Sequence, residues 1–353
     1  MVRLRLPSGR VSAPTLVRLV ELATAYGNGI VQLTSRAGLQ LRGLADPLPG
    51  AFVAAVAATG LLPSTTHERV RNIVASPLTG LHGGLANVSG LTRALDLGLT
   101  SEPTLADLPG RFLFVLDDGR GDVIDLRFDL AYQAAGPDRG HVLAGSSHYG
   151  VAVTTAEAVP TLLRLTHAFA DARQATRAWH VAELPDLARW ADQLGLQPVP
   201  RTQGSVGVPL GRLGHAASVA VPLARLTAAQ AEAAAGVATA DIVITPWRGL
   251  VIPGGADRLD HLAASGLVID DDAAWAQLSA CVGLPACAKS RIDTVAVAEA
   301  LVATGRPLPR THLAGCERRC GAPTEEHYDL VAPTVTEALA VVTGRRPPVG
   351  PRQ

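Results

Sequence analysis

The placement of the cysteines constrains this chain more than any other feature, because all four lie between residues 281 and 320 of 353. They form two close pairs, Cys281 and Cys287 with C-x5-C spacing and Cys316 and Cys320 with C-x3-C spacing. Four thiolates are the ligand set of an iron–sulfur cubane, one for each iron. We therefore expect one [4Fe-4S] cluster, with the rest of the chain as its scaffold.

Two other uses of four cysteines remain open. A structural zinc site usually takes C-x2-4-C pairs, a spacing that the second pair meets and the first does not easily meet. Disulfide pairing is less suited, since no apolar secretory segment precedes the fold and a chain of this length folds without cross-links. The ligand chemistry favours the cluster over both.

Composition excludes several classes of protein. The 48% of hydrophobic residues is ample for a core, and no uninterrupted apolar run reaches the ~18 residues that span a bilayer. A formal net charge of zero argues against a nucleic-acid binder, and the cysteine usage fits a reducing cytoplasm. Lys289 is the only lysine among 31 basic residues. Codon bias explains most of the arginine excess, so individual arginines need individual arguments.

The order of predicted elements repeats within the chain. The first copy has strands at 2–6, 30–34 and 39–44 and helices at 14–27 and 52–59, which is a ferredoxin-like order. The second copy has strands at 218–223, 242–245 and 250–252 and helices at 227–238 and 258–264. The phrases "TSRAGL" at 34–39 and "TPWRGL" at 245–250 correspond. We expect an α+β fold built by duplication.

Each copy continues into a longer segment. In the first, residues 111–129 are predicted to form a hairpin with "DDGRGD" as its turn, and residues 151–172 a strand and a helix. The prolines of 185–203 indicate an interdomain linker. The phrase "RNIVASPLTG" at 71–80 stands where the first cysteine pair stands in the second copy. Only one copy can therefore hold metal.

The cysteine motif, a C-x5-C, a helix and then G-C-x3-C-x-x-P, resembles that of the sulfite and nitrite reductase superfamily. Within it, "GLPACAKS" and "HLAGCERRCGAP" are most similar to the precorrin-3B synthase family. The resemblance covers nearly the whole chain and implies a sulfite reductase-like fold, in which two half-sites related by a pseudo-twofold axis enclose one pocket. In the reductases the last cysteine, here Cys320, also bridges the cluster to sirohaem. Whether Cys320 bridges to anything here is left open.

The resemblance and the repeat together imply five segments. They are a ferredoxin-like half at 1–66, a cysteine-free domain at 67–192, a linker and second ferredoxin-like half at 193–268, the cluster-binding domain at 269–345, and a proline-rich tail at 346–353. Relatives carry a short segment before the first strand, whereas this sequence begins almost on that strand.

The implied substrate is precorrin-3A, a reduced tetrapyrrole whose eight carboxylate arms suit arginine forks. Arg36 and Arg71 match superfamily positions that hold the carboxylates of the macrocycle, and Arg248 lies in the "TPWRG" phrase. Arg111 stands where the reductases have the first of two active-site lysines, which makes it the candidate catalytic residue. Further candidates for contact with the ring are Gln40, Arg42 and Trp247, which could also be ordinary strand or core side chains.

One departure from the reductases separates the functional alternatives. Leu113 stands where the second active-site lysine would be, so the pair of cations that binds an anion and delivers protons is incomplete. The resemblance therefore implies an O2- and NADH-dependent hydroxylation of precorrin-3A with lactone formation, in aerobic cobalamin biosynthesis and without sirohaem. A small sirohaem-dependent sulfite or nitrite reductase and a non-catalytic tetrapyrrole or electron carrier are the alternatives. An electron-donating reductase as partner and a separate non-haem iron are left open.

Overall fold

Each copy of the repeat forms the predicted elements, which confirms the α+β fold by duplication. The computed structural model describes residues 1–145, 149–199, 204, 207–323, 325–342 and 344. The first copy contains β1 (Val2–Leu4), β2 (Arg10–Val11), α1 (Ala13–Tyr26), β3 (Val31–Leu33), β4 (Leu39–Leu41) and α2 (Gly50–Ala57). The second contains β11 (Gly211–Leu213), β12 (Ala216–Ala220), β13 (Arg225–Leu226), α6 (Ala228–Val237), β14 (Ile242–Ile244), β15 (Gly249–Pro253) and α7 (Leu259–Ala264).

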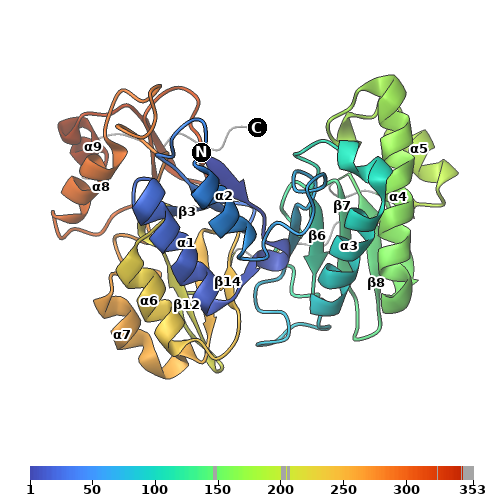
Figure 1. Cartoon of the computed structure of the whole chain (residues 1–353), viewed down its shortest axis with the longest axis horizontal. Coiled ribbons are helices and arrows are strands. Elements are labelled where there is room, and N and C mark those ends of the chain that lie inside the picture. Colours follow the sequence, from blue (N-terminus) through green and yellow to red (C-terminus); the bar gives the residue numbers. More distant parts are fainter. Residues whose placement is uncertain (146–148, 200–203, 205–206, 324, 343, 345–353) are drawn as a thin grey trace.

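The two copies exchange their shortest strands. The first central sheet has the order β1-β4-β3-β13, and the second central sheet has the order β11-β12-β15-β14-β2. Thus β13 of the second copy pairs with β3, while β2 of the first copy pairs with β14. One hydrophobic cluster joins both copies, and α1 and α6 lie side by side over it (Figure 1). The reciprocal exchange makes the two copies one pseudo-symmetric body.

The turn between the last two strands of each copy has one geometry. The Thr34 hydroxyl accepts the Gly38 N–H at 3.1 Å, and the Thr245 hydroxyl accepts the Gly249 N–H at 3.0 Å. In both turns the residue before the glycine has a positive φ, 53° at Ala37 and 63° at Arg248. The correspondence predicted from the two phrases therefore holds down to the hydrogen bonds.

The segment after the first copy folds into a separate unit, here called domain 1, with a six-stranded sheet of order β10-β9-β8-β7-β6-β5. In Figure 1 it occupies the right-hand side, with α3, α4 and α5 on its outer side. Its elements are β5 (Ile73–Ala75), α3 (Ser89–Ser101), β6 (Phe114–Asp117), β7 (Leu130–Ala134), β8 (Arg139–Ala144), β9 (Tyr149–Thr154), α4 (Thr155–Thr176), α5 (Leu187–Gln193) and β10 (Gln197–Pro198).

Two sequence-based expectations in domain 1 are wrong. Residues 111–129 do not form a hairpin, because β6 pairs with β7 in parallel. The "DDGRGD" residues instead form a crossover loop in which buried Asp117 accepts the N–H groups of Gly119 and Gly121. The linker expected at 185–203 contains α5, whose Leu187, Trp190 and Ala191 pack into the domain 1 core. Apolar packing at helical spacing outweighed the flanking prolines.

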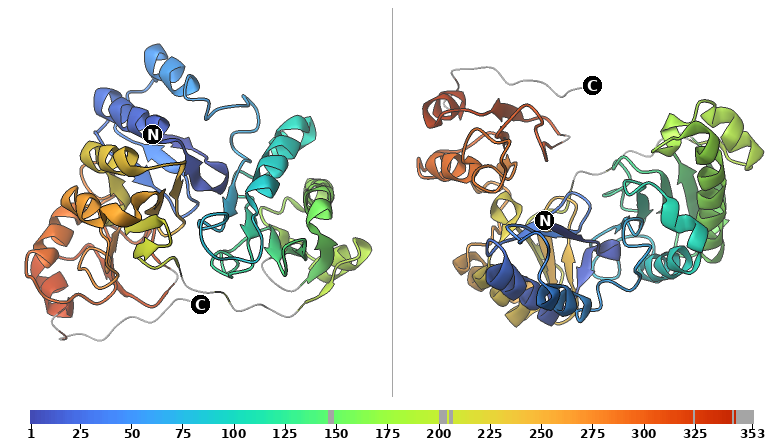
Figure 2. Two further views of the ribbon diagram at one scale, coloured as in Figure 1. Left: turned by 90° about the horizontal axis from the view of Figure 1, so that it is seen from below. Right: turned by 45° about the horizontal axis from the view of Figure 1, so that its top comes forward.

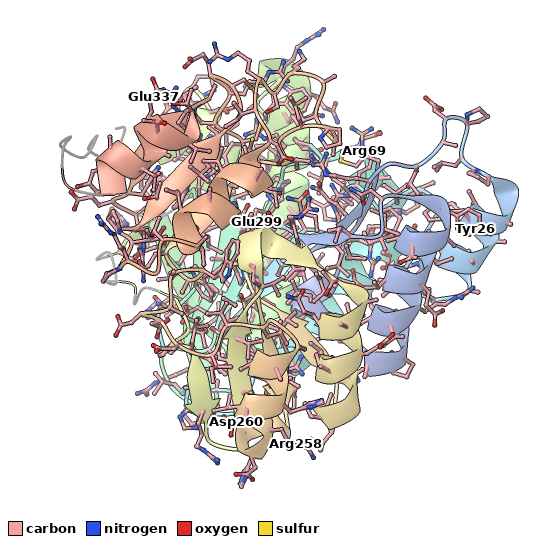
Figure 3. All side chains as sticks on the ribbon, turned by 90° about the vertical axis from the view of Figure 1, so that its left-hand side faces the viewer. Tyr26, Arg69, Arg258, Asp260, Glu299 and Glu337 are labelled. Carbon is pink, nitrogen blue, oxygen red and sulfur yellow. The ribbon has the colours of Figure 1, made fainter. Side chains whose placement is uncertain are left out.

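The C-terminal segment forms domain 2, whose three-stranded parallel sheet has the order β16-β17-β18. Its elements are β16 (Leu278–Ala280), α8 (Thr294–Val302), β17 (Thr311–Ala314), β18 (Tyr328–Val331) and α9 (Val335–Val342). Figure 2 shows domain 2 and domain 1 on opposite sides of the N-terminal strands. In Figure 3, Glu299 on α8 and Glu337 on α9 mark domain 2 at the end of the molecule away from Arg258 and Asp260. The predicted tail at 346–353 lies outside the described residues.

None of the helices in the described ranges is both long and apolar enough to cross a membrane.

Candidate functional site

The two cysteine pairs lie on loops that leave adjacent parallel strands of domain 2. Cys281 follows the last residue of β16, and Cys316 follows β17 after one glycine. Since β16 and β17 pair in parallel, their carboxyl ends lie at one edge of the sheet. The Cys281 sulfur accepts the N–H of Gly315 at 3.1 Å, which ties the two loops together. The topology thus brings pairs separated by α8 to one place.

Arg42 is a common electrostatic neighbour of the cysteine loops. Burial and Arg3 lower the pKa of the Arg42 guanidinium, whereas Cys287, Cys320 and Cys281 act to raise it. Across the ranges that the structure describes, no three His, Cys, Asp or Glu side chains converge as they would on a single metal ion. A cubane presents four irons to four separate thiolates, so it needs cysteines spread around a volume. All four sulfurs are free of disulfides, so they remain available as the four ligands that a cubane needs.

A polar row crosses the first central sheet on the face opposite its core. Arg3 of β1 pairs with Gln40 of β4, Gln40 with Gln32 of β3, and Gln32 with Arg225 of β13. Cross-strand partners point to the same face of a sheet, so these four side chains form a line. Arg42 bonds to it, donating to Gln32 at 2.9 Å and to Gln40 at 2.8 Å. We call these five residues the polar row.

More arginines extend the polar row toward domain 1. Burial, Arg111 and Arg3 depress the pKa of Arg36, while Asp129 opposes them. Arg5 lies among the same cations. Burial lowers its pKa most, and Arg36, Arg3 and Arg69 lower it further. Arg3 and Arg111 are exposed, and Arg36 is half-buried. The cations stand close enough to destabilise one another's charge, which an anionic ligand would relieve.

Arg3, Arg5, Arg36 and Arg111 are here called the arginine cluster. Asp129 lies at the domain 1 end of this cluster. Its buried carboxylate accepts the N–H of Leu113 at 2.8 Å and of Val181 at 2.9 Å. Burial raises the pKa of Asp129 to about 6, against the effect of those N–H groups and of Arg36. Leu113 itself is 4% exposed and belongs to an apolar cluster of domain 1. The Leu113 side chain, where the reductases have their second lysine, therefore packs into an apolar core and not against the arginine cluster.

Arg71 does not join the cluster, contrary to the prediction. Its guanidinium is 5% exposed and grips both oxygens of Asp96, at 2.7 and 2.8 Å. A further nitrogen donates to Glu68 at 3.0 Å and to the Leu61 carbonyl at 3.3 Å. A guanidinium so fully bonded inside the protein holds α3 against the loop before β5. The geometry does not support a role in gripping substrate.

Arg248 and Trp247 also lie elsewhere. Arg248 donates to the carbonyl of Gly321 at 2.8 Å, next to Cys320. Burial lowers the pKa of its guanidinium, and the nearby charge of Glu325 opposes that effect. Trp247 packs against the apolar cluster of domain 1 that contains Leu113. The expected convergence of Arg36, Arg71 and Arg248 is therefore not seen, because each has a different set of charged neighbours.

Two buried histidines have hydrogen-bond partners close by. His67 is buried and bonds through Nε2 to the Glu102 carbonyl at 3.0 Å. His312 is buried, bonds through Nδ1 to the Ser279 hydroxyl at 2.9 Å, and has its pKa lowered to about 3 by burial, Arg248 and His327. His82 is exposed, and His148 lies outside the described residues.

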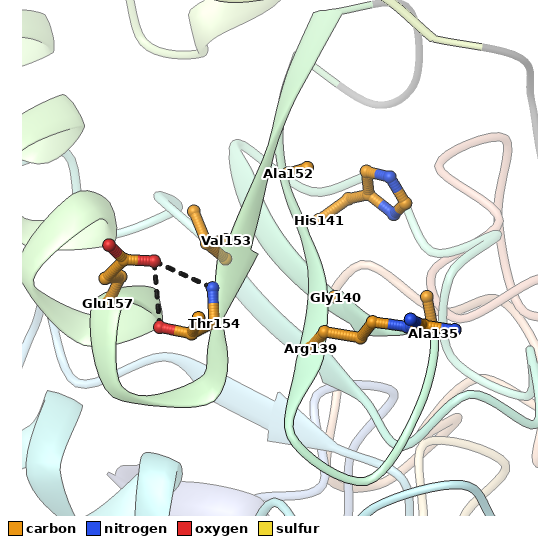
Figure 4. Close-up of a pocket in the computed structure, with 8 residues that line it drawn as sticks. All are labelled: Ala135, Arg139, Gly140, His141, Ala152, Val153, Thr154 and Glu157. Carbon is orange, nitrogen blue, oxygen red and sulfur yellow. Dashed lines mark hydrogen bonds between the residues drawn. The ribbon is translucent and has the colours of Figure 1, made fainter.

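A surface hollow of about 440 Å³ lies on domain 1 away from these residues. Figure 4 shows it between the ends of β8 and β9 and the start of α4, with Arg139 and His141 at its side. Glu157 there accepts from the backbone and hydroxyl of Thr154, each at 2.8 Å, as the N-terminal cap of α4. None of the predicted site residues lines this hollow.

The sequence carried an unused signal for the polar row. Arg3 and Arg5 alternate with Leu4 and Leu6, and Gln40 and Arg42 flank Leu41. Period-two alternation places the polar set on one face of the sheet. Arg225 and Asp129 carried no such signal, because their neighbours come from other parts of the chain.

Comparison with known proteins shows what this chain is similar to. Residues 1–48 match the nitrite/sulfite reductase ferredoxin-like half domain. The chain is 27% identical over 410 residues to the ferredoxin–nitrite reductase of Synechococcus elongatus, covering 98% of this chain and 78% of that protein. It is also 27% identical over 360 residues to a precorrin-3B synthase of a Sinorhizobium species, covering 94% and 77%. The structure of the NirA protein of Mycobacterium tuberculosis has the same fold, with a TM-score of 0.71 at 20% identity over 91% of this chain and 68% of that one.

Proposed function

We propose that this chain, an oxidoreductase with the fold and the N-terminal half domain of the nitrite and sulfite reductases, acts as a precorrin-3B synthase. The observation that carries the proposal is the polar row with its arginine cluster, which extends from the cysteine loops to domain 1 across one sheet face. A row of guanidinium groups suits a flat ligand with many carboxylate arms better than it suits nitrite or sulfite.

Cys281, Cys287, Cys316 and Cys320 would hold a [4Fe-4S] cluster. When bound, such a cluster supplies electrons one at a time. The protein's own contribution is visible around it. The Gly315 N–H bonds to the Cys281 sulfur, and the Arg42 cation lies near Cys281, Cys287 and Cys320.

The polar row and Arg36 would bind and orient the carboxylates of precorrin-3A. Each bidentate contact fixes one arm, so several together hold the ring plane against the first central sheet. In the overall reaction, one oxygen atom of O2 enters the product and the other leaves as water. NADH supplies the two electrons, and lactone formation by a ring acetate completes the product.

A nitrite or sulfite reductase is the second candidate, favoured by the match of 98% of this chain to the Synechococcus elongatus enzyme. Reduction of a small anion needs cations placed around it, and removal of one such group typically costs 10²–10³ in rate. Here Arg111 is exposed, but Leu113 is buried in an apolar cluster. We therefore favour the tetrapyrrole substrate.

Anaerobic purification separates the candidates. We expect brown protein with about four iron and four sulfide per chain, no extractable sirohaem, and conversion of precorrin-3A to a product gaining one oxygen when O2 and NADH with a reductase are supplied. Sirohaem in stoichiometric amount together with nitrite or sulfite turnover would establish the second candidate. A colourless protein with one zinc would overturn both.

A further inference from the structure

Arg248 is a predicted substrate arginine whose side chain hydrogen-bonds to domain 2. It lies in the turn between β14 and β15, where its N–H donates to the Thr245 carbonyl at 2.9 Å and its φ is 63°. The matching turn of the first copy has Ala37 at φ 53°. The left-handed backbone therefore belongs to the repeated turn, while the long side chain is particular to the second copy.

The side chain contacts the backbone just after the last cysteine. Its Nη2 donates to the Gly321 carbonyl at 2.8 Å. Gly321 has φ +85°, and a Cβ added there would lie 3.1 Å from that nitrogen. The left-handed φ favours glycine at this position, and the absence of a Cβ leaves room for the guanidinium.

The loop between Cys316 and Gly321 is held by side chains on its other side as well. Arg319 forms an ion pair with Asp329 of β18, and Glu317 lies 3.5 Å from Arg291. These contacts are internal to domain 2. Arg248 instead comes from the second copy of the repeat. It therefore ties the cysteine loop to the pseudo-symmetric body made by the two copies, here called the central body.

The anchoring of the four cysteines is uneven. Cys281 follows β16 directly and Cys316 lies one residue beyond β17, but Cys320 is exposed on the loop itself. Before Cys320, the chain is fixed by the Arg319 N–H donating to the Cys316 carbonyl at 3.1 Å. After Cys320, the first contact with the central body is the one to Arg248. This hydrogen bond lies at the surface, but its donor is a charged guanidinium, and charge-assisted hydrogen bonds are stronger than neutral ones, so it can hold that side of the loop.

We propose that Arg248 is a positioning residue for Cys320, clamping the loop from Cys316 to Gly321 onto the central body, and not a contact for substrate carboxylates. The consequence for the bound cluster rests on the proposed function. The clamp itself does not, because it is a contact between two parts of this chain.

Hydrogen exchange on the full-length, anaerobically purified protein tests the clamp. In Arg248→Ala, amides of 316–322 should exchange roughly 10-fold faster, the scale set by a lost charged hydrogen bond. In Arg248→Lys the exchange rate of these amides should lie between those of wild type and Arg248→Ala, since lysine keeps a hydrogen-bond donor but loses the planar fork. Arg212→Ala is the control, because it removes an exposed arginine of the same copy whose partner Asp257 is also exposed. Peptides of β14 and β15 report whether the fold is intact.

A second readout is the rate at which a chelator removes iron, which should rise roughly 10-fold in Arg248→Ala and stay unchanged in Arg212→Ala. Unchanged exchange of 316–322 in Arg248→Ala, in protein whose β14 and β15 peptides are protected as in wild type, overturns the clamp. If wild-type protein holds no iron, the proposed cluster fails while the exchange experiment still decides the clamp.

Discussion

The loops that follow β5 and β16 hold equivalent places in the two halves of the molecule but carry different chemistry. In domain 1 the Ser76 hydroxyl accepts the N–H of Asp118 at 3.1 Å. In domain 2 the Cys281 sulfur accepts the N–H of Gly315 at the same distance of 3.1 Å. Both side chains begin the loop after the first strand of a parallel pair. The backbone accepts either group at this point, but only a thiolate is a ligand for iron–sulfur iron.

Domain 1 fills the equivalent space with its own side chains. Ser76 donates to Asp122 at 2.6 Å, and Arg120 pairs with Asp118 at 2.8 Å. Both carboxylates are buried. In domain 1 this loop is therefore held by contacts among Ser76, Asp118, Arg120 and Asp122, whereas in domain 2 the equivalent loop carries cysteines.

The sheet faces differ in the same direction. At the positions that match Arg3, Gln40, Gln32 and Arg225 in the repeat, the second central sheet carries Ser218, Val251, Val243 and Arg10. Val243 and Val251 are at most 1% exposed and pack with Leu78 of the domain 1 loop. The second copy uses its face to bind domain 1, whereas the first keeps a face of arginines and glutamines beside the cysteines.

The largest expected effect comes from removing one member of the equivalent pair. Cys281→Ala should reduce iron from about four per chain to near zero, because a cubane lacking one of its thiolates is poorly held. Ser76→Ala should leave iron content unchanged and lower stability by ~1–3 kcal/mol, because Asp122 and the Asp118 N–H lose a buried partner. Iron analysis with chemical denaturation measures both. Full iron in Cys281→Ala would break the comparison.

The second prediction concerns the buried acid of domain 1. Burial raises the pKa of Asp122 from 3.8 to about 7, Ser76 acting against it and Asp117 adding to it. The folded state thus keeps this proton between about pH 4 and pH 7 after the unfolded chain has lost it. Stability should fall as pH rises across that window, by up to about 4 kcal/mol for a shift of ~3 units.

Asp122→Asn removes this titration, so its stability should vary less with pH over the same window. Urea denaturation from pH 4 to pH 8, followed through exchange of the β5 peptide, measures the difference, and a β14 peptide serves as the internal reference. Parallel pH profiles for wild type and Asp122→Asn would show that Asp122 has an ordinary pKa.

The smallest expected effect separates the two sheet faces. Arg3→Ala and Arg36→Ala should each weaken precorrin-3A binding by ~1.5–3 kcal/mol, the range for a lost charged hydrogen bond. Lysine at either position should restore part of it. Arg10→Ala, at the position of the second sheet that matches Arg225, should leave affinity unchanged, since Arg10 donates to the Thr79 carbonyl of domain 1 at 3.0 Å. Anaerobic binding titrations, with the iron content of each variant checked, measure these affinities. An equal loss of affinity in Arg10→Ala and in the Arg3 and Arg36 variants would show that the first sheet face is not the substrate-binding face.

The candidate site was only partly predictable. The four cysteines and Arg36 carried motif and spacing signals, and the structure places Arg36 in an arginine cluster. Arg71 carried the same kind of signal but is neutralised by Asp96, which lies 25 positions along the chain. A motif records which residue stands at a position, while the partner of a guanidinium depends on what packing brings near it.

The sequence by itself determined the duplication, the order of the main helices and strands within each copy, and the two cysteine pairs, because periodicity, caps and ligand spacing are local properties. Only the tertiary structure decided the exchange of β2 and β13, the parallel pairing of β6 with β7, and the reach of Arg248 to Gly321. The exchange of β2 and β13 and the reach of Arg248 join segments far apart in the chain, while β6 and β7 are near in sequence but are joined by a crossover and not by a hairpin turn. Their pairing is selected by burial of whole faces and by satisfaction of buried charge, which no local pattern contains.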